Sequence, residues 1–243
     1  MSSSDINANS TVRPLRGLFD CRVSATDGEI GTIDDFFFDD TAWIVRYFHI
    51  DTGPWLNDRQ ILISPVAIIN DNWDHGDLSV ALTKDTIAAG PAIPTWRDMS
   101  HQEEADLIGH FDWMPYWGPA KGAPVTGIGG VGRESDTPLS QPAFTKQNDS
   151  DIKPQLRRFG ELINFEIRAK GVNGGGVVDA VVDIQTWIIS KLAVSTRKWL
   201  PGGNVLVPLP RIDRVDWAQG QVHVDLTRKA IKNSPKFRPH GSC

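Results

Sequence analysis

The chain has 243 residues and a net charge of −5, and 40% of its residues are hydrophobic. This length suits two domains, the acidic balance argues against a general nucleic-acid binder, and no run of 18 apolar residues predicts a membrane span. Cys21 and Cys243 are too few for a disulfide framework or a thiolate metal site, and the first residues lack the apolar core of a signal peptide, so we expect a cytoplasmic protein.

The first part of the chain is predicted to consist of short β-strands. Residues 30–38 are apolar and β-branched, and residues 43–50 alternate between two faces with a period of two. Further strands are predicted at 60–64 and 77–82, and Thr83 is a suitable cap for the helical turn that follows. Short strands separated by turns, with one terminal helical turn, predict a small antiparallel barrel.

A linker, residues 93–156, follows these strands. Ser100 and Glu103 have the spacing of a capping box, which predicts a short helix over 100–110. Much of the remaining linker is rich in Gly, Pro and Ser, so we expect it to be mobile. After the helix comes an aromatic run that either packs across the barrels as a clasp or contacts a partner: Phe111, Trp113, Tyr116 and Trp117.

Two patterns in the linker suggest ligands but lack the context that the chemistry needs. A G-x-G-x-x-G at residues 127–132 has no buried strand before it and no helix after it, so nucleotide binding is not expected. The other pattern does not have the spacing of a metal site, and we expect solvated helix side chains: His101, Glu103, Glu104 and His110. With no Ser-His-Asp or Cys-His order apparent, we predict no catalytic residue, cofactor or metal.

The last part of the chain repeats the first. When the sequence is shifted by 144 positions, no gap is needed from Gly31 to Pro91, and about a quarter of the positions are identical. The copies extend over residues 14–92 and 157–239, and we expect their shared tryptophans to be buried, an exposed partner surface being the alternative. Three tryptophan pairs coincide: Trp43 with Trp187, Trp55 with Trp199, and Trp73 with Trp217.

These residues resemble the PRC-barrel family, known from the cytoplasmic domain of the photosynthetic reaction centre H subunit and the C-terminal domain of RimM-type ribosome maturation factors. The pattern runs from Leu18 to Pro91 as DGEIGTIDDFFFDDTAWIVRYFHIDTG, a Trp-Leu turn, ILISPVAI and LTKDTIAAGP. A weaker form, with VNGGGVVDAVVDIQTWII, runs from Leu162 to Pro235. The resemblance implies a mainly β fold of two small, six-stranded antiparallel barrels in tandem, with binding or assembly roles and no conserved catalysis.

Charge is distributed unevenly between the copies. Residues 14–92 contain 5 basic and 13 acidic residues, whereas residues 157–239 contain 14 basic and 7 acidic residues. The two surfaces are either unrelated solvated faces or they attract each other, which would steer docking within the chain or dimerisation. Four carboxylates near a predicted hairpin either cap its turn or bind a divalent cation weakly: Asp34, Asp35, Asp39 and Asp40.

We interpret the chain as a non-enzymatic cytoplasmic binding or assembly module, whose partner is another protein or a second copy in a homodimer. The residues suggested for the partner surface are Trp113, Tyr116, Trp117, Arg211 and Arg214. A ribosome- or RNA-associated maturation role is one alternative, and it needs a contiguous basic face on the second copy: Arg157, Arg158, Arg211, Arg214, Arg228 and Lys229. An enzyme with a site between the barrels is the other alternative.

Overall fold

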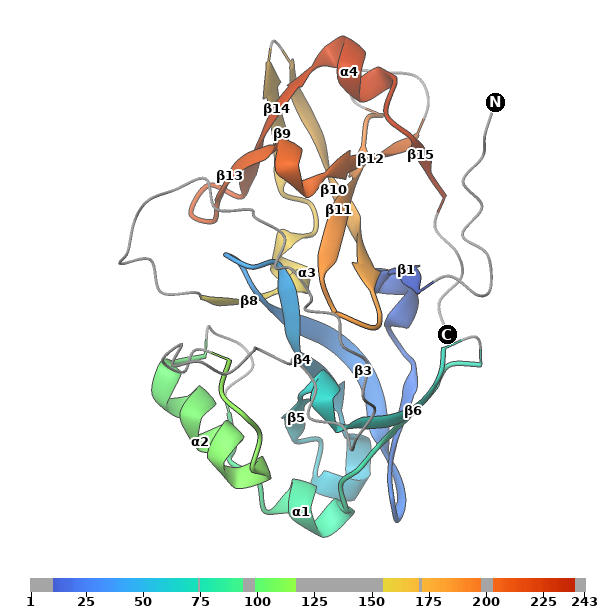
Figure 1. The fold of residues 1–243 in the computed structure, drawn as a ribbon, viewed down its shortest axis with the longest axis vertical. Coiled ribbons are helices and arrows are strands. Elements are labelled where there is room, and N and C mark those ends of the chain that lie inside the picture. The colour runs from blue at the N-terminus through green and yellow to red at the C-terminus, as the bar shows by residue number, and fades with distance from the viewer. Residues whose placement is uncertain are drawn as a thin grey trace, which may run out of the picture.

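The computed structural model describes residues 11–73, 75–93, 99–116, 155–170, 172–197 and 203–238. They form two β-sheets, which occupy the lower and upper halves of Figure 1. The mainly β fold expected from the sequence is therefore confirmed. We call residues 11–93 the first unit and residues 155–238 the second unit.

The first sheet takes six strands from the first unit and one from the second. The strands are β2 (Arg22–Ala25), β3 (Gly28–Asp39), β4 (Ile44–Asp51), β5 (Gln60–Ile63), β6 (Ile68–Asn72), β7 (Asp77–Val80) and β8 (Leu156–Arg158). Their order is β5-β4-β3-β2-β7-β6, and β8 pairs with β3. The helical segments of the first unit and the linker are η1 (Leu15–Leu18), which lies against β10 of the second sheet, η2 (Gly53–Leu56), η3 (Pro65–Ala67), α1 (Lys84–Ala88) and α2 (His101–Phe111).

The second sheet has the same plan. Its strands are β1 (Val12–Pro14), β9 (Glu166–Lys170), β10 (Val172–Asp183), β11 (Ile189–Ser195), β12 (Asn204–Pro208), β13 (Ile212–Asp216), β14 (Gln221–Thr227) and β15 (Lys236–Phe237). The order β12-β11-β10-β9-β14-β13 matches that of the first sheet strand for strand, and β15 is added beside β12. The helical segments are α3 (Phe159–Leu162), η4 (Leu209–Arg211) and α4 (Arg228–Lys232).

The two units exchange one short strand each. Strand β1 leaves the first unit and pairs with β10, and β8 leaves the second unit and pairs with β3. The pairing Val12↔Asp183 in one sheet corresponds to Leu156↔Asp39 in the other, because both partners differ by the same 144 positions. The duplication is therefore also a reciprocal exchange, which sequence comparison did not predict.

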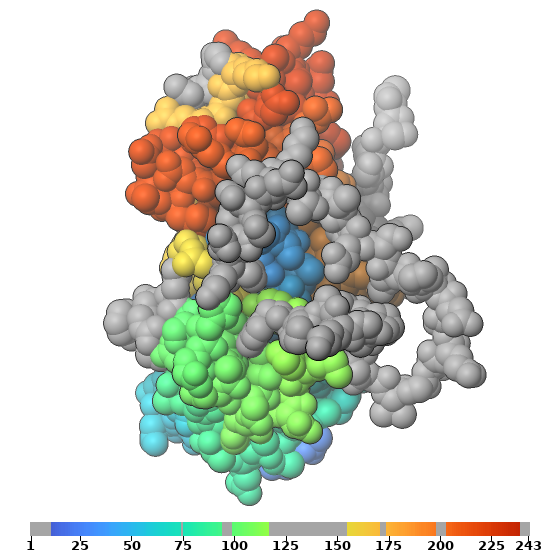
Figure 2. Space-filling model, turned by 60° about the vertical axis from the view of Figure 1, so that its left-hand side comes forward, coloured from blue at the N-terminus to red at the C-terminus, as the bar shows by residue number. Residues whose placement is uncertain are grey.

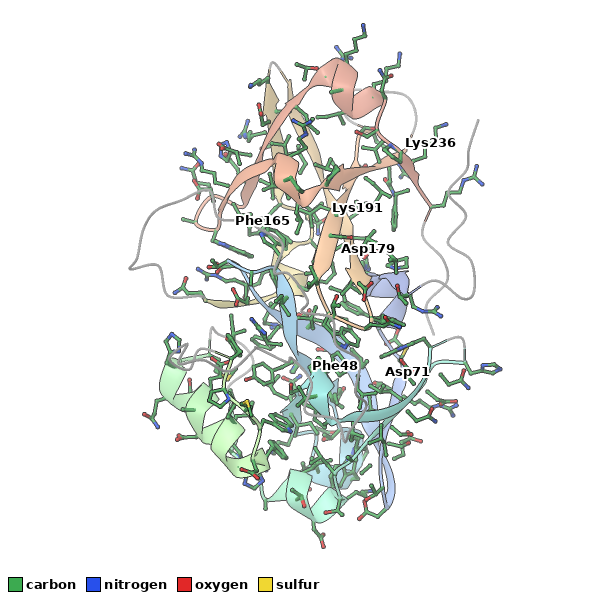
Figure 3. All side chains as sticks on the ribbon, viewed as in Figure 1. Phe48, Asp71, Phe165, Asp179, Lys191 and Lys236 are labelled. Atoms are coloured by element: carbon green, nitrogen blue, oxygen red, sulfur yellow. The ribbon has the colours of Figure 1, made fainter. Side chains whose placement is uncertain are left out.

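Buried carboxylates accept hydrogen bonds from the exchanged segments. The backbone N–H of Arg16 donates to Asp179 Oδ1 over 3.0 Å, and that of Gly160 donates to Asp35 Oδ1 over 2.9 Å. Figure 3 labels Asp179 at the junction between the two sheets. Both aspartates are buried, and a buried carboxylate without a hydrogen-bond donor would destabilise the fold. The crossing segments provide these donors.

One hydrophobic cluster extends through both units, so the copies do not have separate cores. Trp187 of the second unit lies edge-on to Phe48 and Trp73 of the first, with ring centroids 4.8 Å and 5.8 Å apart. The expected structural role of the shared tryptophans is confirmed for Trp73 and Trp187, which are buried, and for the half-buried members that pack against the cluster: Trp43, Trp55 and Trp217. Trp199 lies outside the described residues.

The predicted turn chemistry is also confirmed. Asp39 Oδ1 accepts the backbone N–H groups of Thr41 and Ala42, both over 2.9 Å. Thr83 caps α1 and Thr227 caps α4, each through its hydroxyl oxygen. These local interactions were predictable because capping depends on residues within a few positions of one another.

The structure confirms only part of the barrel prediction. Wholly antiparallel sheets were expected, but each sheet contains one parallel pair of strands, β2 with β7 and β9 with β14. Within the described residues, no strand pair joins the two ends of either strand path. Closure into two barrels therefore stays a prediction.

The structure does not support the reducing compartment that was inferred from the cysteines. The side chain of Cys21 is fully buried and disulfide-bonded, and the other cysteine of the chain, Cys243, lies outside the described residues. The cysteines therefore do not argue for a reducing compartment. Among the helices that the structure describes, none has the length and apolar character needed to cross a membrane.

Candidate interaction surface

The linker helix α2 packs on the first sheet. Its capping box is present as predicted: Ser100 Oγ accepts the Glu103 N–H, and the Glu103 carboxylate accepts the Ser100 N–H over 2.9 Å. Leu107 of α2 belongs to a small cluster with Phe37 and Leu62 of the sheet. In Figure 1, α2 lies outside the first sheet at the lower left, and Figure 2 shows this green segment as part of the surface of the lower half.

Glu104 contradicts the expectation that the charged residues of the linker helix are solvated. It is buried, the Tyr47 hydroxyl donates to its Oε1 over 2.9 Å, and Tyr116 also hydrogen-bonds to it. Burial raises the pKa of Glu104 to about 7, because the two phenols compensate only part of the lost hydration. The Arg46 guanidinium lies 3.7 Å from the centre of the Tyr116 ring and closes the cluster on one side.

The aromatic run lies against the first unit. Phe111 and Trp113 stack with ring centroids 4.5 Å apart, and Trp113 lies 6.3 Å from Tyr47 of β4. Trp113 and Tyr116, two residues suggested for the partner surface, are thus half-buried in intramolecular contacts. These contacts favour packing within the chain over an exposed partner surface, but they involve the first unit, so a clasp across both barrels stays a prediction. Trp117 lies outside the described residues.

The four carboxylates of the acidic run each face a basic group. Two of the pairs, those of Arg157 and Arg158, cross between the units, so the opposite charges of the copies help to dock them within the chain. No group of three or more potential metal ligands occurs in the part of the chain that the structure describes. The pairs are Asp34 with His49 (3.0 Å), Asp35 with Arg158 (3.0 Å), Asp39 with Arg46 (3.2 Å) and Asp40 with Arg157 (3.5 Å).

Arg211 and Arg214, the other residues suggested for the partner surface, lie on the second sheet. Both are exposed, at the end of η4 and in β13. They are thus on different elements from Trp113 and Tyr116. In the turned view of Figure 2, the orange surface of this part of the chain forms much of the upper half.

A cavity of about 810 Å³ lies on the second unit beside these arginines. It is open to solvent and is lined by charged and polar side chains of β9, β13 and β14, including Arg168, Lys170, Asp213, His223 and Asp225. Nothing in the periodicity of the sequence indicated these residues, because alternating polar residues on the outside of a strand are ordinary. They are the part of the candidate site that sequence reasoning missed.

Strand register places three basic side chains abreast beside this cavity. Arg214 of β13 pairs with His223 of β14, and His223 pairs with Arg168 of β9. Arg214 Nη2 lies 3.5 Å from His223 Nε2. We call Arg168, Arg214 and His223 the basic row.

The first unit provides an internal comparison for the basic row. Its equivalent strands pair in the same register, so the same three positions again lie abreast. Because both units fold alike with different residues there, the fold itself does not require the three basic side chains. The comparison between copies is the signal that could have identified the row from the sequence. The equivalent residues are Ser24, Asn70 and Ser79.

No family model matches this sequence, and no curated protein matches it. The resemblance to the PRC-barrel family therefore rests on the residue pattern given above.

Proposed function

We propose that the chain is a non-enzymatic binding or assembly module of two PRC-type units, each closing into a small barrel. The units dock on each other and present the basic row and its cavity to a protein partner. The equivalent strand order of the two sheets and the shared tryptophans support the two-unit reading. A cytoplasmic location, expected from the sequence, forms part of the proposal.

The observation that carries this proposal is the difference between two otherwise equivalent faces. Duplicated units tend to retain what folding needs, so charges found on one copy only are best explained by a role outside folding. The basic row adjoins an open cavity, and cavities with a few convergent polar groups are favoured places for binding. Of the residues suggested for the partner surface, Arg214 belongs to the row and Arg211 lies three positions before it, whereas Trp113 and Tyr116 lie on the first unit and form no part of this surface.

The RNA-associated alternative is weakened by the positions of its basic residues. Arg157 and Arg158 are engaged with Asp40 and Asp35 at the junction, so they do not extend a basic face toward a phosphate backbone. The remaining residues of that set are exposed: Arg211, Arg214, Arg228 and Lys229. The cavity lies on the second unit alone, so it does not support an enzyme with its site between the units.

The proposal is tested by affinity capture from native lysate with three immobilised proteins. They are the wild type, a row variant with Arg168→Ser, Arg214→Asn and His223→Ser, and a matched variant with Arg228→Ala and Lys229→Ala. A specific partner should be retained by the wild type and the matched variant and lost by the row variant. Retention that is equal on all three would contradict the proposal, and size-exclusion chromatography with light scattering would separate a heterologous partner from self-association.

A further inference from the structure

The basic row has a defined width. Neighbouring strands lie about 4.8 Å apart, so three residues abreast on β13, β14 and β9 span about 10 Å. Residues directly opposite each other in a sheet point to the same face, which places Arg214, His223 and Arg168 side by side. The row therefore presents cationic groups at both ends of a short line that crosses the strands.

The rows beside it carry the opposite charge. Asp216, Gln221 and Glu166 lie abreast in the next row, and Glu166 pairs with Arg168 over 3.0 Å. Farther along, Asp225 pairs with Lys170 over 2.5 Å. Positive and negative groups thus alternate over this face within a few ångströms. A ligand with a negative charge on every repeating unit would place some of these charges against the acidic side chains. A ligand whose negative charges are separated by neutral units can place them against the basic side chains alone.

We infer that the basic row binds spaced carboxylates of an acidic, extended peptide segment of the partner protein. This inference rests on the proposed function. In an extended chain, alternate side chains lie on one side about 7 Å apart, which is less than the width of the row, so carboxylates at positions i and i+2 reach Arg214 and Arg168 through the length of the two arginine side chains. Guanidinium groups suit this ligand because they bind carboxylates strongly, and at Arg168 a carboxylate of the segment would compete with Glu166. The open cavity of about 810 Å³ provides room for the segment beside the row.

A single-stranded RNA is the less suitable occupant of this face. Its backbone carries one negative charge per nucleotide, and affinity grows with the number of phosphates that the protein neutralises. Here the acidic groups Asp213, Asp216 and Asp225 lie in or beside the same surface and oppose a continuous polyanion. The three strands of the basic row contain no Phe, Tyr or Trp on which a base could stack, as bases do in general single-strand binders.

Fluorescence anisotropy on the full chain tests the inference with defined probes. The probes are a labelled peptide of alternating glutamate and serine, the same peptide with lysine in place of glutamate, and a decauridylate RNA, all at low salt. The row variant and the matched variant both lose two formal positive charges, so they differ in position and not in net charge. The residues introduced by the row variant already occur at the equivalent positions of the first unit, and thermal unfolding checks that the variant is folded.

The glutamate peptide should bind the wild type saturably, and the row variant should weaken that binding by about tenfold or more. The matched variant should change it by less than about twofold. Equal weakening by both variants, no saturable binding of the glutamate peptide, or tighter row-dependent binding of the RNA would overturn the inference. Row-dependent capture of a lysate protein without peptide binding would leave the proposed function standing and refute only the carboxylate assignment.

Discussion

Asp35 and Asp179 are equivalent residues in different electrostatic settings. Each accepts a backbone N–H from the segment that crosses from the other unit. Asp35 also pairs with Arg158 over 3.0 Å, whereas the residue equivalent to that arginine is Pro14, which brings no charge to Asp179. Burial raises the pKa of Asp179 to about 6, in keeping with a carboxylate that lacks a guanidinium partner of this kind.

Substituting asparagine at the two positions should therefore have unequal effects. Asparagine keeps an oxygen that can accept the N–H, but Asp35→Asn leaves Arg158 beside a neutral group, and we expect a loss of about 2–3 kcal/mol. Asp179→Asn should cost less than about 1 kcal/mol, because it removes a charge that burial already disfavours. The free energies of unfolding in urea provide the measurement. An equal or larger loss for Asp179→Asn would show that the guanidinium pair is unimportant.

Glu104 should make stability depend on pH. Its pKa is raised from 4.5 to about 7 in the folded chain, so the unfolded state ionises first as the pH rises. The stabilisation associated with the protonated carboxyl is complete below pH about 4.5 and declines until pH about 7. A shift of this size corresponds to at most about 3.4 kcal/mol. The expected result is a wild-type protein that is less stable at pH 8 than at pH 5.

The variant Glu104→Gln separates the effect of Glu104 on stability from that of Asp179. The raised pKa of Asp179 also lowers stability as the pH rises, but over a lower pH range. Glutamine is neutral throughout and still accepts a hydrogen bond from Tyr47, so the decline between pH 6 and pH 8 should largely disappear. Urea unfolding at several pH values measures the free energies, and hydrogen exchange in α2, corrected for intrinsic rates, reports whether this helix loosens. The same decline in the variant would exclude Glu104 as its source.

At the scale of elements, two glycines distinguish a tight junction from an open helix face. A Cβ on Gly160 of α3 would lie 2.7 Å from Asp35 Oδ2, at the point where the exchanged segment enters the first sheet. A Cβ on Gly109 of α2 would meet nothing within 4 Å, and that residue is exposed. The same substitution thus meets opposite surroundings in two helical segments.

Gly160→Ala and Gly109→Ala should consequently shift stability in opposite directions. The first displaces a buried carboxylate that also holds Arg158, and we expect a loss of about 1–2 kcal/mol. The second replaces glycine by a better helix former at an exposed position and should add about 0.5–1 kcal/mol. The unfolding temperatures of both variants, compared with that of the wild type, measure the two changes in stability. A stabilising Gly160→Ala would mean that the junction accommodates a methyl group without moving Asp35.

The sequence predicted the elements better than their partners. Thr83, Ser100 and Asp39 form caps and turns with residues close in sequence, so their roles could be read locally. The exchange of β1 and β8 could not, because these strands are three residues long and their partners lie more than a hundred positions away. The burial of Glu104 escaped prediction for the same reason, since it depends on Tyr47 from a distant strand.

For the whole molecule, the sequence indicated two copies of opposite charge but not how they combine. The ion pairs of Arg157 and Arg158 with the first unit show that part of the charge asymmetry serves docking within the chain. The basic row is a different part of that asymmetry, because its members lie on three neighbouring strands of the second sheet, β9, β14 and the edge strand β13. Only the paired register of β9, β13 and β14 brings its members together.

A shared core and two exchanged strands should make the chain unfold as one cooperative unit. Trp187 is buried and contacts Phe48 and Trp73 of the other unit, so its removal affects both halves. Trp187→Ala should cost about 3–5 kcal/mol, the usual range for truncating a buried aromatic residue. Met114→Ala, at a side chain that is 88% exposed, is the surface control and should change the free energy little.

Hydrogen exchange at increasing urea concentration, followed separately in β4 and β11, tests whether the units are coupled. In the wild type the two strands should lose protection at the same midpoint, as a two-state transition requires. In Trp187→Ala both midpoints should fall together by the same amount, because loss of the indole weakens the common core. Two separate midpoints in the wild type, or a fall confined to β11, would mean that each unit is stable without the other and that the exchanged strands only tether them.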